Sequence, residues 1–482
     1  MDTRNRLPFL RRHFYCSCHG CEKKIAELMR GREGVCHLKE TLRLPSELLE
    51  DANDHRGCSD DLAEMRICDK GKCTGCAACL NICPSQCILM EEDEFGVLRP
   101  HVDDKRCQHC NLCVSTCPNN LELSFRYPTH CFAAWNVESE RRRKCASGGV
   151  ASVLGEYVVK VKHGVVFGVA YSRDLIPVLS YCETLDGIEG FKGSKYVQAK
   201  VEPDMFLKAR QFLDKGRFVL FVSTPCQVAG LKSFLGKEYP NLVTVDLICH
   251  GVVPTRYFTD ELATILNRKK INPDKTTDVR FRGNDGIIVK PTFWDKFCNK
   301  NRSANFTMTL WAADGQRNGE IAVLCEDVNE SCYLAGFLEG ITLRENCYQC
   351  KYAVPERISD LTIGDFIGIG KRIPFAGPDN VSSVTTNSGK GADFFRHVRK
   401  CHPELRCEER SYSERLEYRP SLLCPFPRSE LRDKFLAAYQ EMGWRKASAR
   451  VIGKHLLKMR AVNLASALIQ GCRRVFGFQK GA

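Results

Sequence analysis

The chain has 482 residues, of which 43% are hydrophobic and 27% are charged. This composition indicates a soluble globular protein with room for two or three domains. No run of about 18 apolar residues occurs, which excludes a membrane-spanning helix. The formal net charge of +13 suits an acidic partner and an ordinary solvated surface equally well, so it selects no partner.

The first 64 residues differ from the rest of the chain. Their cysteines have spacings that fit no cluster or zinc site: Cys16, Cys18, Cys21, Cys36 and Cys58. We expect residues 1–64 to be a poorly structured extension, with translation starting at Met65. The alternative is a regulatory or metal-binding extension. Arg11 and Arg12 are followed by polar residues rather than an apolar segment, so no export signal is indicated and we expect a cytoplasmic protein.

Two cysteine ladders with the same spacing, C-x2-C-x2-C-x3-C-P, come next. In this pattern the first three thiolates of a ladder bind one 4Fe–4S cluster and the fourth binds the other cluster. The first cluster is therefore expected on these thiolates: Cys73, Cys76, Cys79 and Cys117. The second is expected on the remaining ones: Cys107, Cys110, Cys113 and Cys83. A zinc ribbon or a disulfide framework is the alternative, but neither needs a doubled ladder.

The surroundings of the ladders fit this interpretation. The chain has 29 cysteines, and without an export signal they favour metal ligands over disulfides. Apolar residues at 88–90 and 97–100 flank an acidic turn and predict a hairpin. We expect a two-cluster ferredoxin domain over residues 65–124, similar to bacterial two-cluster ferredoxins. Cys68 and Cys87 lie outside the ladders and are expected to be small buried side chains rather than ligands.

From Cys131 onward the pattern changes to alternating helices and buried strands. Apolar residues recur at helical spacing over 150–161, and Ser147 is expected to cap the N-terminus of that helix. The segments that follow alternate as strand, helix, strand, helix and strand: 164–169, 204–214, 218–222, 228–235 and 242–248. This order predicts an α/β domain with a mostly parallel sheet and helices on its faces.

Four cysteines of this region form a second candidate site. Cys226 and Cys249 stand at the carboxyl ends of neighbouring predicted strands, where ligands bind in parallel sheets. Cys347 and Cys350 add a pair separated by two residues. A third 4Fe–4S cluster on these thiols is one interpretation. The alternative is half a zinc site or a redox pair at Cys347 and Cys350, with the other two as buried thiols.

Phosphate-binding glycine motifs are missing from the sequence. Without G-x-G-x-x-G or a P-loop, a nicotinamide-binding Rossmann unit and nucleotide hydrolysis are not indicated. Ser147, Gly148 and Gly149 precede a helix, where free N–H groups could accept a phosphate or the edge of a flavin. An ordinary helix start explains the same residues.

Seven stretches, taken in order, resemble the coenzyme F-420 hydrogenase/dehydrogenase beta-subunit family in its form with an N-terminal two-cluster ferredoxin domain. They are CFAAWN at 131–136, SGG at 147–149, GSKYVQ at 193–198, TPCQVAGL at 224–231, ICHG at 248–251, RENCYQCKY at 344–352 and RISDLTIGDF at 357–366. The resemblance covers the chain from about residue 66 to residue 425.

The resemblance implies an FAD-containing oxidoreductase domain over residues 125–425 with one 4Fe–4S cluster of its own. The cluster thiols of the family correspond to four positions: Cys226, Cys249, Cys347 and Cys350. Flavin is implied near four others: Ser147, Gly148, Gly149 and Lys195. Relatives pass hydride between FAD and the deazaflavin F-420. Similar bacterial sequences are associated with cell-surface polysaccharide synthesis, and the stretch at 133–136 resembles that group.

These features predict an iron–sulfur flavoprotein oxidoreductase that relays electrons between a two-electron organic partner and a one-electron carrier, through FAD and 4Fe–4S clusters. The expected partners are a small substrate or coenzyme and a redox protein such as a ferredoxin or complex subunit, and not nucleic acid. One alternative is a non-catalytic electron-transfer subunit of a larger redox complex. Another is a bacterial reductase in cell-surface polysaccharide biosynthesis.

Two further features have open roles. His250 follows Cys249 and is a candidate proton carrier, although a hydrogen bond to backbone or cluster sulfur explains such a histidine equally. Residues 426–482 are expected to form a basic helical tail. Its cations lie among apolar residues, which indicates either a terminal helix packed on its own domain or a docking helix or membrane-surface contact.

Overall fold

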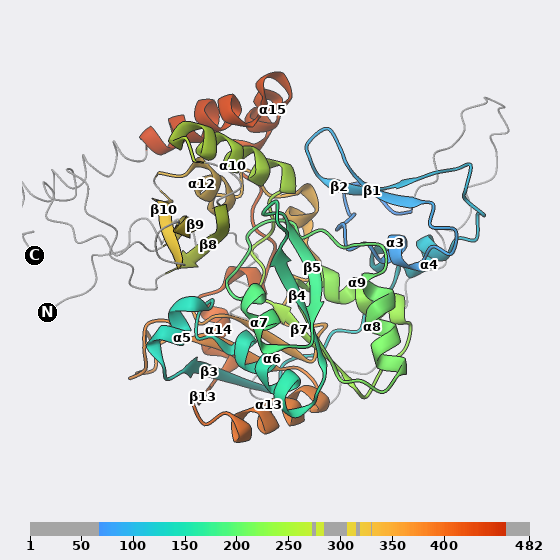
Figure 1. Cartoon of the computed structure of the whole chain (residues 1–482), viewed down its shortest axis with the longest axis vertical. Helices are drawn as coiled ribbons and strands as arrows, with labels where there is room; N and C mark the ends of the chain where they lie inside the picture. The colour runs from blue at the N-terminus through green and yellow to red at the C-terminus, as the bar shows by residue number, and fades with distance from the viewer. Residues whose placement is uncertain (1–66, 272–275, 284–305, 315–318, 329, 459–482) are drawn as a thin grey trace, which may run out of the picture.

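The computed structural model describes residues 67–271, 276–283, 306–314, 319–328 and 330–458. The fold is α/β, as predicted, with a small ferredoxin unit beside a large mixed sheet and with helices in the C-terminal part (Figure 1). The expected extension over 1–64, the start at Met65 and the end of the tail lie outside the described residues. Within the described ranges, no helix has both the length and the hydrophobicity that crossing a membrane requires.

The ferredoxin unit consists of a hairpin and two short helices, drawn in blue in Figure 1. Strand β1 (Ile88–Glu92) pairs antiparallel with β2 (Leu98–Val102), which confirms the predicted hairpin. The Asp93 carboxylate closes the turn by accepting two backbone N–H groups, each at 3.0 Å. Helices α3 (Ala78–Ile82) and α4 (Leu112–Thr116) each contain one cysteine of a ladder.

The central sheet has eight strands in the order β13-β3-β12-β11-β7-β6-β4-β5. In chain order they are β3 (His130–Asn136), β4 (Val165–Tyr171), β5 (Pro177–Cys182), β6 (Val219–Ser223), β7 (Leu242–Leu247), β11 (Leu361–Asp365), β12 (Ser382–Thr386) and β13 (Leu405–Arg410). The middle strands β11, β7, β6 and β4 are parallel, and antiparallel strands complete both edges. Strands β4, β6 and β7 match the predicted apolar runs, because strands covered on both faces are mainly apolar, although β7 also buries Thr244 and Asp246.

Helices cover both faces of this sheet. Val219 and Phe221 of β6 face one layer and Leu220 faces the other, as the period of two in a strand requires. The helices of the first layer are α8 (Met205–Asp214) and α9 (Pro225–Leu235). Those of the second are α6 (Val150–Val161) and α13 (Gly389–Cys401), with α5 (Ser139–Lys144) and α7 (Leu185–Phe191) nearby in Figure 1.

The ferredoxin unit shares its hydrophobic core with the first helix layer. Ile88 and Cys76 of the unit belong to one buried cluster with Phe206 of α8 and Val228 of α9. The Asn81 side chain fixes this contact, since its Oδ1 accepts the N–H of Phe206 at 2.9 Å. The first cysteine ladder therefore lies directly against α9.

A three-stranded antiparallel sheet and three helices form a further layer at the top of Figure 1. Its elements are β8 (Thr276–Gly283), β9 (Phe306–Asp314), β10 (Gly319–Asp327), α10 (Thr255–Lys269), α12 (Cys332–Leu338) and α15 (Arg432–Ala447). Trp444 of α15 donates its indole N–H to Glu261 at 2.7 Å and stacks on Tyr257, with ring centroids 5.3 Å apart. The described part of the basic tail therefore packs on the rest of the chain.

Candidate functional site

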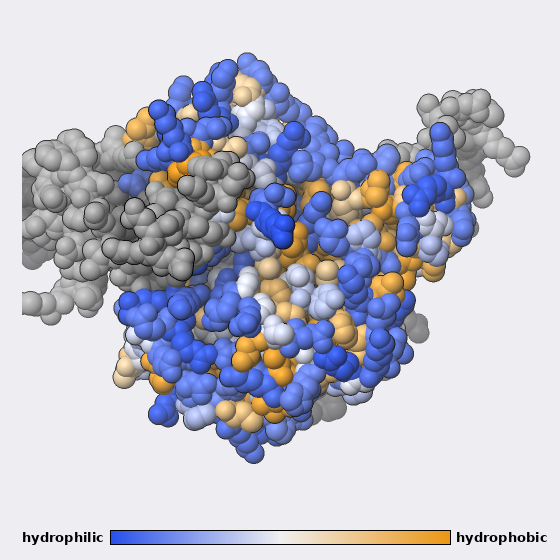
Figure 2. Space-filling view, in the orientation of Figure 1, coloured by the Kyte–Doolittle hydropathy of each residue, from blue (hydrophilic) through white to orange (hydrophobic). Residues whose placement is uncertain are grey.

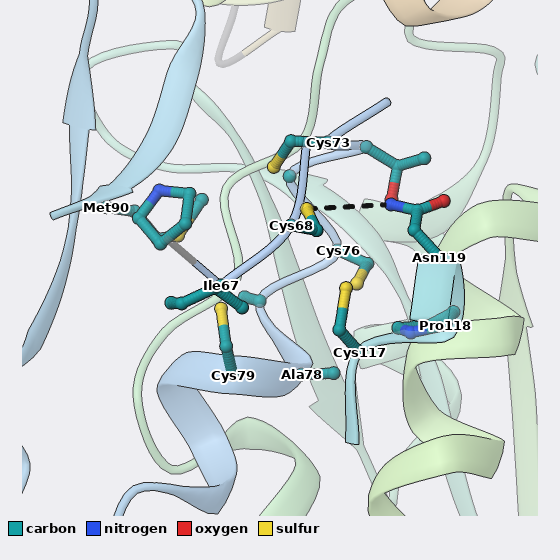
Figure 3. Close-up of a pocket in the computed structure, with 14 residues that line it drawn as sticks. Ile67, Cys68, Cys73, Cys76, Ala78, Cys79, Met90, Cys117, Pro118 and Asn119 are labelled. Atoms are coloured by element: carbon teal, nitrogen blue, oxygen red, sulfur yellow. Dashed lines mark hydrogen bonds between the residues drawn. The ribbon is translucent and has the colours of Figure 1, made fainter. Parts of the chain in front are cut away.

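The two cysteine ladders surround two separate cavities. Five cysteines line the first (Figure 3): Cys68, Cys73, Cys76, Cys79 and Cys117. Four of them are the ligands predicted for the first cluster. Cys117 joins them from the second ladder, as the exchange of the fourth thiolate between ladders requires.

The second cavity is also lined by five cysteines. Its cysteines are Cys83, Cys87, Cys107, Cys110 and Cys113. They include the four predicted for the second cluster, with Cys83 coming from the first ladder. Cys110 is exposed to solvent, so this cavity is the outer one of the two. The structure thus groups all eight ladder cysteines as predicted, and their binding of iron stays a prediction.

Cys68 and Cys87 each add a fifth cysteine to a cavity, which the spacing of the ladders does not predict. Cys87 is buried, as expected, whereas Cys68 is half-buried and receives a hydrogen bond from the Asn119 amide at 4.0 Å. Hydrogen bonding with Cys68 lowers the pKa of Cys73 to about 6 and that of Cys117 to about 7. Thiolates bind iron, so Cys68 favours the binding form of two predicted ligands.

The four other candidate cysteines also converge, from three segments of the chain. Cys226 lies at the start of α9, Cys249 follows β7, and Cys347 and Cys350 lie in and just after the 3-10 helix at 345–349. Burial, and then the charges of the other three thiols, raise the pKa of Cys249. Such mutual effects require short separations. Among the described residues, no group of three or more His, Cys, Asp or Glu is placed to hold one metal ion directly.

Arg344 connects this third cysteine group to the first cavity. Its side chain is buried, and Nη1 donates to the carbonyl oxygen of Thr74, within the first ladder, at 2.6 Å. Burial alone would lower the pKa of Arg344, but the charges of Cys347 and Cys226 raise it overall. A guanidinium in this position stabilises negative charge on both sides of it.

Buried polar groups between the first cavity and the third cysteine group suit a bound cofactor that accepts hydrogen bonds. Thr74 Oγ1, the Gln198 amide and the Tyr352 hydroxyl have no hydrogen-bond partner among the described residues. Because burying such groups unpaired is unfavourable, a partner within the cavity would stabilise them. Hydrogen bonds to cluster sulfur are one of the means by which proteins tune cluster potentials.

A glycine determines how closely α9 approaches the first ladder. A Cβ atom at Gly230 would lie 2.9 Å from Cβ and 3.1 Å from Sγ of Cys76. Gly230 also lies about one helical turn after Cys226. Helix α9 therefore contacts the first ladder one turn away from the third cysteine group.

Gly230→Val is expected to destabilise the fold by about 1–3 kcal/mol, because the added side chain overpacks the contact with Cys76. Urea unfolding of the anaerobic protein measures this. Gly389→Val is the matched control, since a Cβ there would meet nothing within 4 Å. Equal stability of the two variants would contradict the close approach of α9.

The turn at 147–149 differs from its expected form. Helix α6 begins at Val150 with Gly149 as its N-cap residue in a left-handed conformation, φ 83°, so the expectation that Ser147 caps it is wrong. Ser147 Oγ instead donates to the carbonyl of Val381 at 2.8 Å. The N–H of Gly148 donates to Ser382 Oγ at 2.9 Å, and that of Gly149 is bonded within the turn. These two N–H groups are not free for a phosphate; flavin contact through other atoms stays a prediction.

Lys195 is engaged within its own turn. Its ammonium group donates to the carbonyl oxygens of Gly190, Lys192 and Gly193 at 3.2, 2.8 and 3.3 Å. Burial lowers the pKa of Lys195 to about 8. The side chain thus closes the turn, and its expected contact with flavin stays a prediction.

His250 has a backbone partner, one of the two roles considered for it. Its Nε2 lies 3.1 Å from the carbonyl oxygen of Phe337 and must donate, because a carbonyl only accepts. Burial lowers the pKa of His250 to about 4. The imidazole is therefore neutral near pH 7 and helps to anchor the loop after β7.

Two models of known protein families match parts of the chain. Residues 72–121 match the model of the 4Fe–4S dicluster domain. Residues 216–406 match the model of the C-terminal part of the coenzyme F-420 hydrogenase/dehydrogenase beta subunit. Residues 216–406 are therefore similar to the C-terminal part of coenzyme F-420 hydrogenase/dehydrogenase beta subunits. The expected resemblance is therefore confirmed, together with its N-terminal dicluster domain.

The match to the F-420 hydrogenase/dehydrogenase family includes all four cysteines of the third group. Among solved structures, the F-420-reducing NiFe hydrogenase complex from Methanosarcina barkeri is 15% identical, with a TM-score of 0.37, over 60% of this chain and 85% of that one. No curated protein matches the chain. The two family-model matches support iron–sulfur clusters in the N-terminal domain and a following domain similar to hydrogenase and dehydrogenase beta subunits.

Proposed function

We propose that the protein is an iron–sulfur flavoprotein oxidoreductase with three 4Fe–4S clusters and FAD. It transfers two electrons from or to an organic partner, such as an F-420-like deazaflavin, and exchanges them singly with two molecules of a one-electron carrier. Bound FAD would supply the conversion between two-electron and one-electron transfer. The matches to the dicluster model and to the F-420 hydrogenase/dehydrogenase model support this assignment.

The continuity of the three cysteine groups is the observation that carries the proposal. Helix α9 contacts Cys76 of the first cavity through Gly230 and starts beside Cys226 of the third group. Arg344 bridges the same two groups through Thr74. A third cluster held by Cys226, Cys249, Cys347 and Cys350 would therefore lie next to the first cluster of the ferredoxin domain.

The chain's own residues perform distinct tasks in this relay. The thiolates hold iron, and Cys68 stabilises two of them in the ionised form. Arg344 offsets negative charge between the third and first groups. We assign residues 65–124 as the ferredoxin domain, 125–425 as the flavin and cluster domain, and 426–482 as the basic tail.

The second cavity is the point at which a protein partner would exchange electrons. Cys110 is exposed there, and the neighbouring Leu112 has 42% of its surface exposed. Leu89 and Leu121 of the same unit are also exposed, at 53% and 39%. Figure 2 shows small apolar groups among the polar atoms of the ferredoxin unit. Exposed apolar residues around a redox centre suit transient docking of a ferredoxin or a complex subunit.

A second candidate is a non-catalytic electron-transfer subunit of a larger redox complex. The matched model describes a beta subunit, which favours this candidate. Both candidates use the same three clusters, and they differ only in whether the chain alone oxidises an organic donor. A reductase of cell-surface polysaccharide biosynthesis is a special case of the first candidate.

An assay of the isolated full chain, prepared without oxygen, separates the two candidates. Reduced F-420 or NAD(P)H is mixed with the protein and a viologen dye as one-electron acceptor. We expect two dye molecules to be reduced for each donor oxidised. Failure with both donors, in protein that contains flavin and all its iron, would favour the non-catalytic subunit.

A further inference from the structure

One buried cation lacks a counter-charge in contact with it within the described part of the chain. Arg415 lies in α14 (Tyr412–Glu417) and is 0% exposed. None of its three guanidinium nitrogen atoms has a hydrogen-bond partner among the described residues. Its guanidinium lies over the ring of Phe366, whose centroid is 5.6 Å from Cζ.

Two other buried arginines, Arg357 and Arg410, are paired with carboxylates, whereas the buried Arg344 donates to the backbone of Thr74 beside cysteine thiols. Arg357 contacts Asp246 at 3.1 Å, and Arg410 contacts Glu414 at 2.7 Å. Arg415 differs from these, although it is at least as deeply buried. A buried unpaired charge is strongly unfavourable, so its retention points to a partner from outside the described residues, and a bound anion would serve as one.

The charge of Arg415 persists at neutral pH. Burial, and then the neighbouring Arg419, lower the pKa of Arg415 to about 9. The guanidinium is therefore still protonated at pH 7. Asp365 is near enough to act on it electrostatically, but none of the guanidinium nitrogen atoms is hydrogen-bonded to that carboxylate.

A second arginine increases the positive charge at this place. The Nε atom of Arg419 is also buried without a hydrogen-bond partner among the described residues. The charge of Arg419 acts on His250 and on Tyr196 as well. This pair of cations therefore lies close to the loop that carries Cys249.

The location is one at which α/β sheets bind ligands. Phe366, which contacts Arg415, directly follows β11, one of the parallel strands, at its carboxyl end. Ligands of open parallel sheets bind outside these ends. Planar guanidinium groups match the geometry of phosphate oxygen atoms better than other cations do.

We propose that Arg415 and Arg419 form a binding site for phosphoryl oxygen atoms. The group is either the diphosphate of a dinucleotide cofactor or the phosphate of a phosphorylated substrate. The dinucleotide alternative rests on the proposed function, because it requires the proposed FAD. The phosphorylated-substrate alternative does not require FAD. Arg415 supplies the buried charge of the site, and Arg419 lies on the side of the third cysteine group.

The test measures flavin content, iron content and diphosphate binding in the full chain, prepared without oxygen. Inorganic diphosphate is titrated calorimetrically into wild type, Arg415→Met, Arg415→Lys and the control Arg396→Met, whose side chain is 60% exposed. We expect Arg415→Met to lose bound FAD, or to bind diphosphate at least about 30-fold more weakly, with unchanged iron. Arg415→Lys should be affected less, and Arg396→Met should match wild type.

The two sources give different results. Loss of FAD from Arg415→Met, with diphosphate competing against FAD in wild type, identifies the dinucleotide. Unchanged FAD with weakened diphosphate binding identifies a phosphorylated substrate. Wild type without flavin would remove the flavin from the proposed function, and diphosphate binding would still test the site.

Unchanged FAD content together with unchanged diphosphate affinity in folded Arg415→Met would overturn the proposal. A purely structural role would give that result, with a lower melting temperature in the absence of diphosphate. If Arg415→Met does not fold, Arg415→Lys is tested instead. Wild-type FAD content together with wild-type diphosphate affinity in Arg415→Lys would then overturn the proposal.

Discussion

Cys226→Ala is expected to remove four of about twelve irons per chain and to leave the two clusters of the ferredoxin domain intact. The physical reason is that the structure places Cys226 with Cys249, Cys347 and Cys350, apart from both ladder cavities. Iron analysis and low-temperature electron paramagnetic resonance of anaerobically purified protein measure the effect. Electron transfer from donor to dye should also be lost, although dithionite should still reduce the remaining clusters.

The control for this variant is Cys407→Ala, because Cys407 is a half-buried cysteine of β13 that lines neither cavity. It should keep all its iron. A wild-type chain with about eight irons and normal flavin would contradict the third cluster. A Cys226→Ala chain with the wild-type spectrum would show that Cys226 is not a ligand.

Arg357→Met is expected to lower the free energy of unfolding by about 3–5 kcal/mol, because it leaves a buried carboxylate without its cation. Arg357 is 2% exposed and its Nη2 lies 3.1 Å from Oδ2 of Asp246, which is fully buried. Its Nη1 also donates to the carbonyl oxygen of Tyr352 at 3.1 Å, beside the third cysteine group. Urea unfolding of the anaerobic protein measures the loss.

Two comparisons make this prediction specific. Arg396→Met removes the exposed pair with Asp393, and should change stability by less than about 0.5 kcal/mol. Adding Asp246→Leu to Arg357→Met should recover much of the loss, since neither position of the pair then carries a buried charge. Equal effects of Arg357→Met and Arg396→Met would contradict the role of the buried pair.

The parts of the molecule that could be predicted from sequence are those with a local signal. The ladder spacing predicts which eight cysteines share which cavity, including the exchange of Cys83 and Cys117. The mainly apolar runs at 164–169, 218–222 and 242–248 predict three parallel strands, because both faces of such strands are buried. Strand β12, with the sequence Ser-Ser-Val-Thr-Thr, has no such run and was not predicted.

Long-range contacts explain the remaining differences. Ser147 has the chemistry of an N-cap, but its hydroxyl is used by Val381, which lies 234 positions further along the chain. Arg344 reaches Thr74 across 270 positions, so no spacing rule could connect the third cysteine group with the first ladder. Cys68 carried a weak signal, since it precedes Cys73 by only a few residues, but the ladder pattern has no place for a fifth cysteine.

The partners of buried arginines could not be predicted from sequence either. The local sequence does not show which of Arg410 and Arg415 has a charged partner. Arg410 lies just before the short helix α14 and Arg415 lies within it, and the segment is rich in charged residues. Only the folded chain shows that Arg410 has Glu414 as a partner, and that Arg415 has none among the described residues. Polar residues of the interior are therefore best interpreted after their partners are known.

The hydrophobic cluster that joins the ferredoxin unit to α8 and α9 has a kinetic consequence. Ile88, Phe206 and Val228 share that cluster, so the unit cannot swing away without exposing apolar surface to water. An electron-transfer domain on a flexible tether must diffuse to its acceptor before transfer, so higher solvent viscosity lowers its transfer rate. In the proposed relay the gap between donor and acceptor is constant, so glycerol or sucrose in the buffer leaves the internal transfer step unaffected.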